Sequence, residues 1–182
     1  MLVQFVLFIL TKIFLLRGRT ASPRITFDRG SHLVAANHHS GLDPFVILAS
    51  VRFRDFFRLA PFSFMTANVF MQPLWIRPLA WATGCFPAYP GLGEYGIDKA
   101  VSNLKDGYTV MIFPEGKRAK GKPVEAKRGV RVILDSVPEA HLILAHIKWD
   151  SSISVRSIRI AHLEGKAIPS TPNAVVDAIY KL

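Results

Sequence analysis

Residues 33–45 read Leu-Val-Ala-Ala-Asn-His-His-Ser-Gly-Leu-Asp-Pro-Phe, and the organisation of the whole chain can be worked out from this stretch. Its first four residues form an apolar run that predicts a short buried strand. A Ser-Gly step, which is typical of turns, follows soon after the strand. Asp43 and Pro44 then predict the start of a helix that ends near residue 52, with Asp43 as the N-cap and Pro44 at the first helical position.

His38 lies at the end of the predicted strand, and Asp43 lies at the mouth of the predicted helix. The short turn between them allows the Asp43 carboxylate to fold back onto the imidazole. A carboxylate in this position fixes the tautomer of a histidine and stabilises its charged form, as a general base requires. A structural histidine beside a capping aspartate has the same spacing, so this stretch alone leaves both interpretations open.

A second block, at residues 110–118, reads Val-Met-Ile-Phe-Pro-Glu-Gly-Lys-Arg. The two blocks together resemble the glycerolipid acyltransferases of the 1-acylglycerol-3-phosphate acyltransferase type. The first block of that family is Asn-His-x4-Asp and its third is Phe-Pro-Glu-Gly-x-Arg, and both occur here in the same order. The resemblance implies a single α/β domain with a mixed, largely parallel central sheet flanked by helices.

The resemblance also implies a reaction, the transfer of a fatty acyl group from acyl-CoA or acyl carrier protein to a hydroxyl of a lysophospholipid. The leading expectation is 1-acylglycerol-3-phosphate as the acceptor and phosphatidate as the product. His38 is then the catalytic general base, and Asp43 is the residue that orients it. The acyl donor is a co-substrate, and no other cofactor is expected.

No metal is expected at this site. His38 and His39 are neighbours on an extended segment, so their side chains point in opposite directions. In addition, no cluster of cysteines or carboxylates in the sequence completes a set of metal ligands.

Glu115 and Arg118 are implied by the resemblance to bind or organise the acceptor. A basic step at residues 127–129 precedes a predicted helix, and a helix N-terminus flanked by basic side chains favours phosphate binding. A solvated surface loop is the alternative for this run of charges. Asn37 is expected either to fix the loop or to contribute to an oxyanion site. The predicted substrate-binding residues are Asn37, Glu115, Gly116, Lys117, Arg118, Lys127 and Arg128.

The composition favours a lipid surface as a partner. Half of the 182 residues are hydrophobic, and the formal net charge of +10 predicts an anionic partner. The apolar excess favours an anionic membrane surface over nucleic acid, and no basic cluster accompanies a nucleic-acid-binding motif. The length predicts one domain. The chain has one cysteine, Cys85, which excludes an intrachain disulfide.

Residues 2–16 are apolar except for Gln4, Thr11 and Lys12. As a helix they span about 22 Å, less than the roughly 30 Å hydrocarbon core of a bilayer. The three polar residues form a narrow stripe, which suits a helix that lies in the membrane interface or packs against the domain. We therefore predict a membrane-associating helix at residues 1–20 and an acyltransferase domain at residues 21–182. The arginines that follow the helix favour monotopic attachment to the cytoplasmic face of the cell membrane.

Other functions are considered because the chain departs from the family pattern. Pro90 stands where the family has an arginine that contacts the phosphate of the acceptor, which favours another lysolipid acceptor or a phosphate contact elsewhere. A lipid hydrolase or thioesterase with Ser40 or Cys85 as nucleophile is a second alternative, although no Gly-x-Ser-x-Gly elbow surrounds either residue. A non-catalytic, membrane-binding relative is a third.

The remaining elements are predicted from hydrophobic periodicity and turn residues. The strand that ends near residue 113 is expected to deliver Glu115 to the carboxyl edge of the sheet, where open α/β sheets place their sites. The predicted strands are residues 25–27, 56–60, 108–113, 142–149 and 153–161, and the predicted helices are residues 94–106, 130–136 and 171–182.

Overall fold

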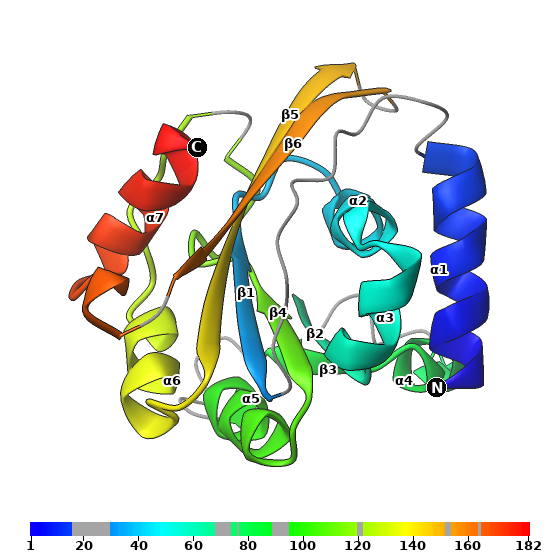
Figure 1. Ribbon diagram of the computed structural model, residues 1–182, viewed down its shortest axis with the longest axis horizontal. Coiled ribbons are helices and arrows are strands. Elements are labelled where there is room, and N and C mark those ends of the chain that lie inside the picture. The colour runs from blue at the N-terminus through cyan, green and yellow to red at the C-terminus, as the bar shows by residue number, and fades with distance from the viewer. Residues whose placement is uncertain are drawn as a thin grey trace.

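The strands form one mixed sheet in the order β3-β2-β4-β1-β5-β6 (Figure 1). The first five strands in this order run parallel to one another, and β6 runs antiparallel to β5. The sheet therefore confirms the predicted mixed, largely parallel architecture. The strands are β1 (His32–Ala36), β2 (Phe62–Ala67), β3 (Cys85–Ala88), β4 (Thr109–Ile112), β5 (His141–Ser151) and β6 (Ser154–Leu163).

These elements belong to a computed structural model, which describes eight stretches of the chain. The described residues are 1–15, 30–67, 74–75, 77–88, 95–119, 122–151, 154–163 and 165–182. The strand predicted at residues 25–27 and the departure from the family pattern at Pro90 lie outside them.

Helices cover both faces of the sheet, with α1 to α3 on one face and α5 to α7 on the other (Figure 1). Strand β1 is buried on both faces because its side chains alternate between two cores. Val34 packs in the core beneath α1 to α3, and Leu33 packs in the core beneath α5 to α7. The helices are α1 (Leu2–Leu15), α2 (Asp43–Ser50), α3 (Phe53–Leu59), α4 (Arg77–Ala82), α5 (Tyr95–Lys105), α6 (Gly129–Ser136) and α7 (Pro172–Lys181).

The strand-turn-helix prediction for residues 33–52 is confirmed, with one correction at the helix start. Asp43 is the first residue of α2 rather than its N-cap, and no side chain caps this helix. An N-cap accepts hydrogen bonds from N–H groups that follow it. The Asp43 carboxylate instead accepts from N–H groups that precede it, on His39 and Ser40. The carboxylate is thus directed back into the loop and away from its own helix.

The strand predicted at residues 56–60 is wrong, because residues 56–59 belong to helix α3 and Ala60 is its C-cap. Aromatic side chains favour strands, but here the helical spacing brings several of them onto one face. Phe56 stacks on Phe8 of α1, with 4.6 Å between the ring centroids. Asp55 in the first turn also favours a helix, because its negative charge lies at the positive end of the helix dipole. The strand of this region starts later, at Phe62.

The other predicted elements within the described residues form close to their expected positions. Helix α7 begins at Pro172, and the Thr171 side chain caps it by accepting a hydrogen bond from the Ala174 N–H at 3.2 Å. Strands β5 and β6 are each somewhat longer than predicted and form an antiparallel hairpin that extends past the rest of the sheet (Figure 1).

Helix α1 turns its polar stripe toward the protein. The Gln4 amide donates hydrogen bonds to the carbonyls of Phe62 and Thr83, at 2.7 and 3.2 Å, and accepts one from the Phe62 N–H. The Lys12 ammonium donates to the carbonyl of Ala49. The exposed large side chains of α1 are therefore apolar, namely Leu2, Val3, Val6, Leu10 and Ile13. Among the described residues, no helix combines the length and apolar character needed to cross a membrane.

Replacing Gln4 with Met is expected to destabilise the fold by about 2–4 kcal/mol, because each buried polar group left unpaired costs roughly 1–3 kcal/mol. Met keeps the length of the side chain and removes its hydrogen bonds. Urea unfolding of the detergent-solubilised protein measures the effect. Leu10→Met, at an exposed position on the same helix, is the control and is expected to stay within about 0.5 kcal/mol of the parent protein. Equal midpoints for both variants would contradict the structural role of Gln4.

Candidate active site

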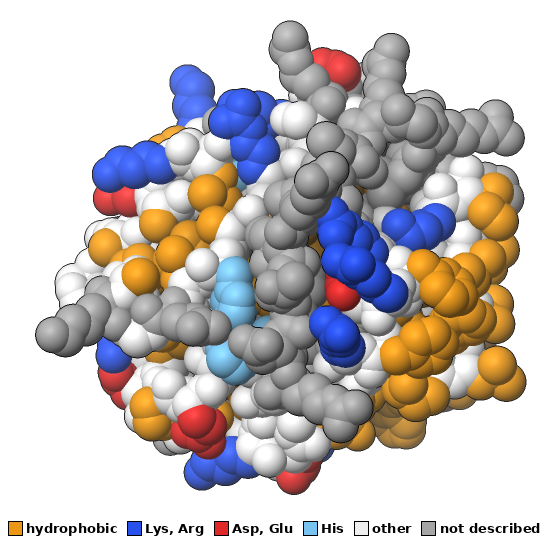
Figure 2. All heavy atoms as spheres, viewed as in Figure 1, with side chains coloured by type: hydrophobic (Ala, Val, Ile, Leu, Met, Phe, Trp, Pro, Cys, Tyr) orange, Lys and Arg blue, Asp and Glu red, His pale blue; other side chains and the backbone are white. Residues whose placement is uncertain are grey.

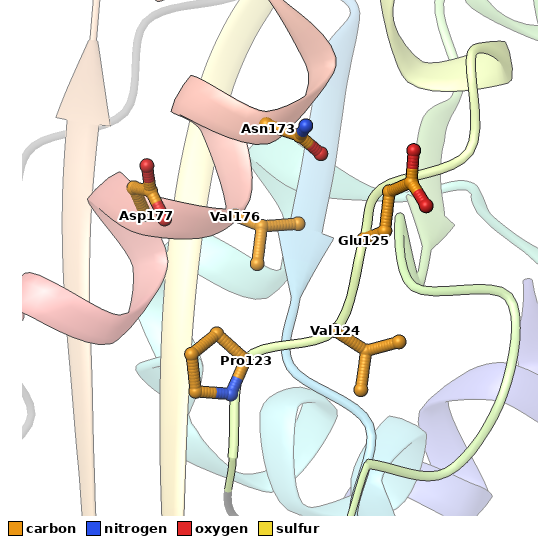
Figure 3. Close-up of a pocket in the computed structure, with 6 residues that line it drawn as sticks. All are labelled: Pro123, Val124, Glu125, Asn173, Val176 and Asp177. Carbon is orange, nitrogen blue, oxygen red and sulfur yellow. The ribbon is translucent and has the colours of Figure 1, made fainter.

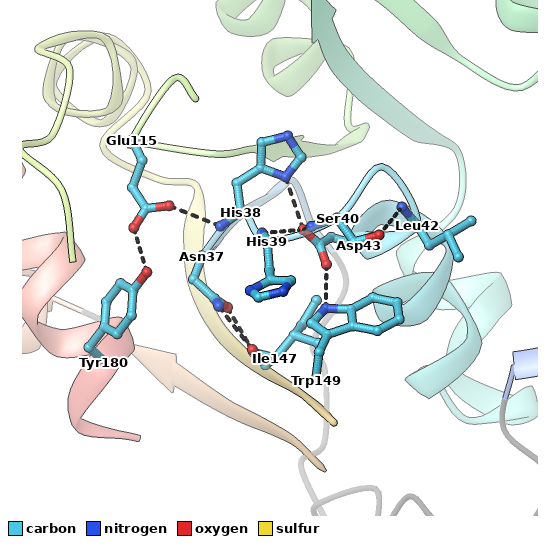
Figure 4. A network of polar contacts seen from close by, with 10 residues as sticks. All are labelled: Asn37, His38, His39, Ser40, Leu42, Asp43, Glu115, Ile147, Trp149 and Tyr180. Atoms are coloured by element: carbon cyan, nitrogen blue, oxygen red, sulfur yellow. Dashed lines mark hydrogen bonds and ion pairs between the residues drawn. The ribbon is translucent and has the colours of Figure 1, made fainter. Parts of the chain in front are cut away.

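The carboxylate of Asp43 is fully buried and accepts four hydrogen bonds (Figure 4). Its Oδ2 atom accepts from the Nδ1 of His38 at 2.9 Å and from the backbone N–H groups of His39 and Ser40 at 2.7 and 2.8 Å. Its Oδ1 atom accepts from the indole Nε1 of Trp149 at 2.8 Å. A buried carboxylate that is hydrogen-bonded on both oxygens is held in one orientation, so Asp43 forms a rigid centre for the site.

The His38 ring is arranged as a general base requires. Its side chain is 22% exposed, and the ring stacks on Phe113 with 4.1 Å between centroids and 20° between planes. A neutral imidazole that gives its Nδ1 proton to Asp43 keeps Nε2 as a free acceptor on the other side of the ring. Figure 4 shows this second nitrogen on the side of the ring away from Asp43. The predicted pairing of His38 with Asp43 is present in the structure.

Asn37 joins the loop to the neighbouring strand. Its Nδ2 donates to the carbonyl of Ile147 at 2.9 Å, and its Oδ1 accepts from the N–H of the same residue at 2.7 Å. The side chain is buried, and both of its polar atoms are engaged with β5. Of the two roles considered for Asn37, this geometry matches the fixing of the loop rather than contact with a substrate.

Glu115 is 1% exposed and bridges two parts of the chain. Its Oε2 accepts from the backbone N–H of His38 at 3.0 Å, and its Oε1 accepts from the hydroxyl of Tyr180 at 2.7 Å. The carboxylate thus ties the end of β1 to helix α7 (Figure 4). The geometry shows Glu115 organising the loop that carries His38. Its implied role in binding or organising the acceptor stays a prediction.

The four basic residues predicted to bind substrate, Lys117, Arg118, Lys127 and Arg128, are exposed. Backbone hydrogen bonds bring their loops close to the base. The Ala119 N–H donates to the carbonyl of His38 at 2.7 Å, and the Lys127 N–H donates to the carbonyl of Pro114 at the same distance. Four positive charges therefore lie on loops that border the His38 pair.

Gly116 lies at a tight turn that only glycine accommodates well. Its φ angle is +64°, a value that other residues rarely adopt. A Cβ atom at this position would also stand 3.0 Å from the Cγ of Lys127. The stem of Lys127 thus packs directly over Gly116, which holds the two basic loops together.

The alternative nucleophiles are poorly placed for a hydrolase. The Ser40 hydroxyl oxygen accepts a hydrogen bond from the Leu42 N–H at 3.2 Å and so stabilises the turn. Cys85 lies on β3, three strands across the sheet from β1, which is roughly 14 Å at normal strand spacing. Burial raises the pKa of the Cys85 thiol, which disfavours the reactive thiolate.

Two residues of this network, Trp149 and Tyr180, were not predicted from the sequence. Both lie on elements far along the chain from His38, and neither belongs to a recognisable motif. The one sequence signal for Trp149 is its place near the end of a strand predicted to be buried. A partly buried tryptophan there has one polar atom, its indole N–H, which needs a hydrogen-bond partner.

A hollow of about 300 Å³ lies elsewhere, between α7 and the segment that precedes α6 (Figure 3). It contains neither His38 nor Asp43. The lining residues are Pro123, Val124, Glu125, Asn173, Val176 and Asp177.

The protein has an α/β fold with a His-Asp pair at the carboxyl edge of its sheet, and the comparisons with known proteins agree with this arrangement. Residues 15–144 match the family described as Acyltransferase, which is more than half of the chain. The protein therefore belongs to the acyltransferase family and is an acyltransferase enzyme, as the resemblance implied.

One solved structure with a similar fold is that of the 1-acyl-sn-glycerophosphate (LPA) acyltransferase PlsC from Thermotoga maritima. The two chains share 18% sequence identity with a TM-score of 0.64, and the match covers 96% of this chain and 76% of that one. At this identity the likeness concerns the fold. No curated protein matches the sequence.

Tyr180→Phe is expected to reduce the loss of stability at alkaline pH. Burial, and then the hydrogen bond and charge of Glu115, raise the pKa of Tyr180 above its ordinary value. The unfolded chain therefore loses this proton first, above about pH 10, and stability falls as pH rises through that region. Urea midpoints at pH 9 and pH 11 measure the slope, which should be shallower in the variant. Identical slopes would show that the Tyr180 hydroxyl is not held as the structure indicates.

Proposed function

We propose that this acyltransferase moves a fatty acyl group from acyl-CoA or acyl carrier protein to a hydroxyl of a lysophospholipid at a membrane surface. The acceptor in this proposal is 1-acylglycerol-3-phosphate, and the product is phosphatidate. The observation that carries the proposal is the His38–Asp43 pair, held at the carboxyl edge of the sheet in a chain of the acyltransferase family.

The reaction follows from the geometry of this pair. His38 Nε2 takes the proton of the acceptor hydroxyl while that oxygen attacks the carbonyl carbon of the thioester. The C–S bond then breaks, and the imidazolium returns the proton to the leaving thiolate, giving an ester and a free thiol. Asp43 holds the ring and stabilises its positive charge. General-base assistance of this kind contributes about 10²–10⁴ in rate.

The basic loops support a phosphorylated acceptor. Lys117, Arg118, Lys127 and Arg128 are exposed beside the His38 pair, and charge-assisted hydrogen bonds from such side chains are strong phosphate contacts. The similar fold of the 1-acyl-sn-glycerophosphate (LPA) acyltransferase from Thermotoga maritima supports the same substrate class. The basic loops supply the phosphate contact that the family arginine at the position of Pro90 would otherwise provide.

The apolar surface of α1 and α3 supports attachment to a membrane. We define the apolar face as the exposed large side chains Leu2, Val3, Val6, Leu10, Ile13, Phe53 and Phe57. Figure 2 shows hydrophobic side chains gathered along the edge of the molecule over α1 and α3, with Lys and Arg side chains beside them. Arg54 and Arg58 on α3 are exposed and suit anionic headgroups.

A second set of exposed apolar residues lies near the start of α1. Leu74, Trp75, Leu79 and Trp81 are all exposed, and α4 is tied to α1 through the hydrogen bond from Gln4 to the Thr83 carbonyl. Tryptophan is enriched at membrane interfaces because its ring is apolar and its N–H is polar. This set and the apolar face support monotopic binding, for which we propose the cytoplasmic face of the cell membrane.

A test of the reaction incubates the protein in liposomes with labelled long-chain acyl-CoA or acyl carrier protein. The acceptors are 1-acylglycerol-3-phosphate, glycerol-3-phosphate, other lysophospholipids and water alone. We expect label in phosphatidate, and a loss of at least about 100-fold in turnover for His38→Ala and Asp43→Asn. Label in free fatty acid alone would indicate a hydrolase. Full turnover by His38→Ala would exclude His38 as the base.

Membrane attachment is tested by adding charge to the apolar face. The double variant Val6→Asp and Leu10→Asp is expected to reduce the partition of the protein onto anionic vesicles at least about 10-fold, because apolar burial and charge attraction both weaken. Co-sedimentation measures the partition. Val132→Asp, at an exposed position of α6 on the other side of the sheet, is the control and should bind as the parent protein does. Unchanged binding of the double variant would rule out this face.

A further inference from the structure

The two oxygens of the buried Asp43 carboxylate accept different numbers of hydrogen bonds. Three donors converge on Oδ2, two of them backbone N–H groups of the loop itself. The partner of Oδ1 is the indole Nε1 of Trp149, at 2.8 Å, from a strand 106 residues away in the sequence. Burying a carboxylate completely is costly unless both of its oxygens accept hydrogen bonds. Trp149 therefore completes the set of donors that the loop cannot supply alone.

The fold aims the indole at this oxygen through an irregularity in β5. The pairing of β1 with β5 ends at Ala36 and Ala145, and Asn37 prolongs the contact to Ile147. On its other edge β5 pairs with β6 from Leu142 to Ser151, and the register of this pairing shifts on both sides of Trp149. A bulge of this kind redirects a side chain and is frequent beside active sites.

The surroundings of Trp149 fit a role at the site. The indole is partly buried at the rim of the core beneath α1 to α3, so it fills no central packing position. Its ring lies nearly parallel to that of His39, with 6.3 Å between centroids and 19° between planes. Trp149 therefore contacts both the carboxylate and the loop that carries His38. It lies beyond residues 15–144, the part of the chain that matches the family.

We infer that Trp149 is a positioning residue of the acyltransferase reaction and that it acts through Asp43. Its N–H holds Oδ1 so that Oδ2 stays directed at His38 Nδ1. It also shares the negative charge of the carboxylate, which keeps the shared proton on His38 rather than on Asp43. This role rests on the proposed function of His38 as the base.

The experiment removes the N–H and keeps the ring. Position 149 is replaced by the benzothienyl analogue of tryptophan, in which sulfur takes the place of the indole N–H, and separately by Phe. We expect kcat to fall about 5- to 50-fold in both variants, while KM for the acceptor changes less than twofold. The acidic limb of the kcat profile should move to higher pH, because a carboxylate with one donor fewer holds a proton more tightly.

A readout independent of turnover is the ¹⁵N and ¹H spectrum of the His38 ring. The Nδ1–H resonance should shift in the benzothienyl variant, and the ring should titrate at higher pH. Glu115, Tyr180 and the basic loops remain in place, so the difference isolates the Trp149 donor. Tyr108→Phe removes an aromatic hydroxyl near the start of β4, away from the site, and serves as the control with an unchanged profile.

The outcomes separate this inference from the proposed function. If His38→Ala abolishes turnover while the benzothienyl variant keeps the parent kcat, pH profile and His38 spectrum, the base is correct and the role of Trp149 is wrong. If His38→Ala is fully active, the proposed base fails, and the spectrum alone still reports whether Trp149 holds Asp43. A lower kcat with an unmoved pH profile and spectrum would reduce Trp149 to a packing residue and overturn the inference.

Discussion

One buried negative charge determines the arrangement of the catalytic edge of this protein. The Asp43 carboxylate has no access to water and is satisfied by four N–H donors from the loop, from His38 and from β5. Leaving such a group unpaired inside a protein costs several kcal/mol. The loop after β1, the start of α2 and the far end of β5 are therefore constrained to meet at one point. The position of the imidazole follows from this meeting, because its Nδ1 is one of the four donors.

A second buried carboxylate holds the other side of the same loop by hydrogen bonds. Glu115 is buried and joins the backbone of His38 to the hydroxyl of Tyr180 on the last helix. The base is thus held by its ring through Asp43 and by its backbone through Glu115. Among the described residues, neither carboxylate forms an ion pair with a lysine or arginine. The lysines and arginines of the basic loops remain exposed, and their charge is directed to solvent or to an anionic ligand.

The sequence predicted most of the parallel sheet and the pairing of His38 with Asp43, because these depend on local signals. An apolar run, a turn and an Asp-Pro helix start occur within 13 residues, and the Glu-Gly block identified the neighbouring strand end. The prediction failed at residues 56–60, where aromatic residues suited to a strand form a helix because they pack against Phe5 and Phe8. Trp149 and Tyr180 were missed for a related reason. Their partners lie 106 and 65 residues away, and only the assembled sheet brings them together.

The orientation of α1 has a consequence for how this enzyme works over many turnovers. Its residues Gln4 and Lys12 form hydrogen bonds with β2, α2 and the turn after α4. The helix therefore cannot leave the body of the protein without breaking these hydrogen bonds. Under the proposed membrane role, helix and catalytic edge move as one rigid piece, and His38 keeps a constant height above the lipid. The enzyme then finds its substrates by lateral diffusion in two dimensions. It stays bound to one leaflet and meets successive lysolipids without returning to water.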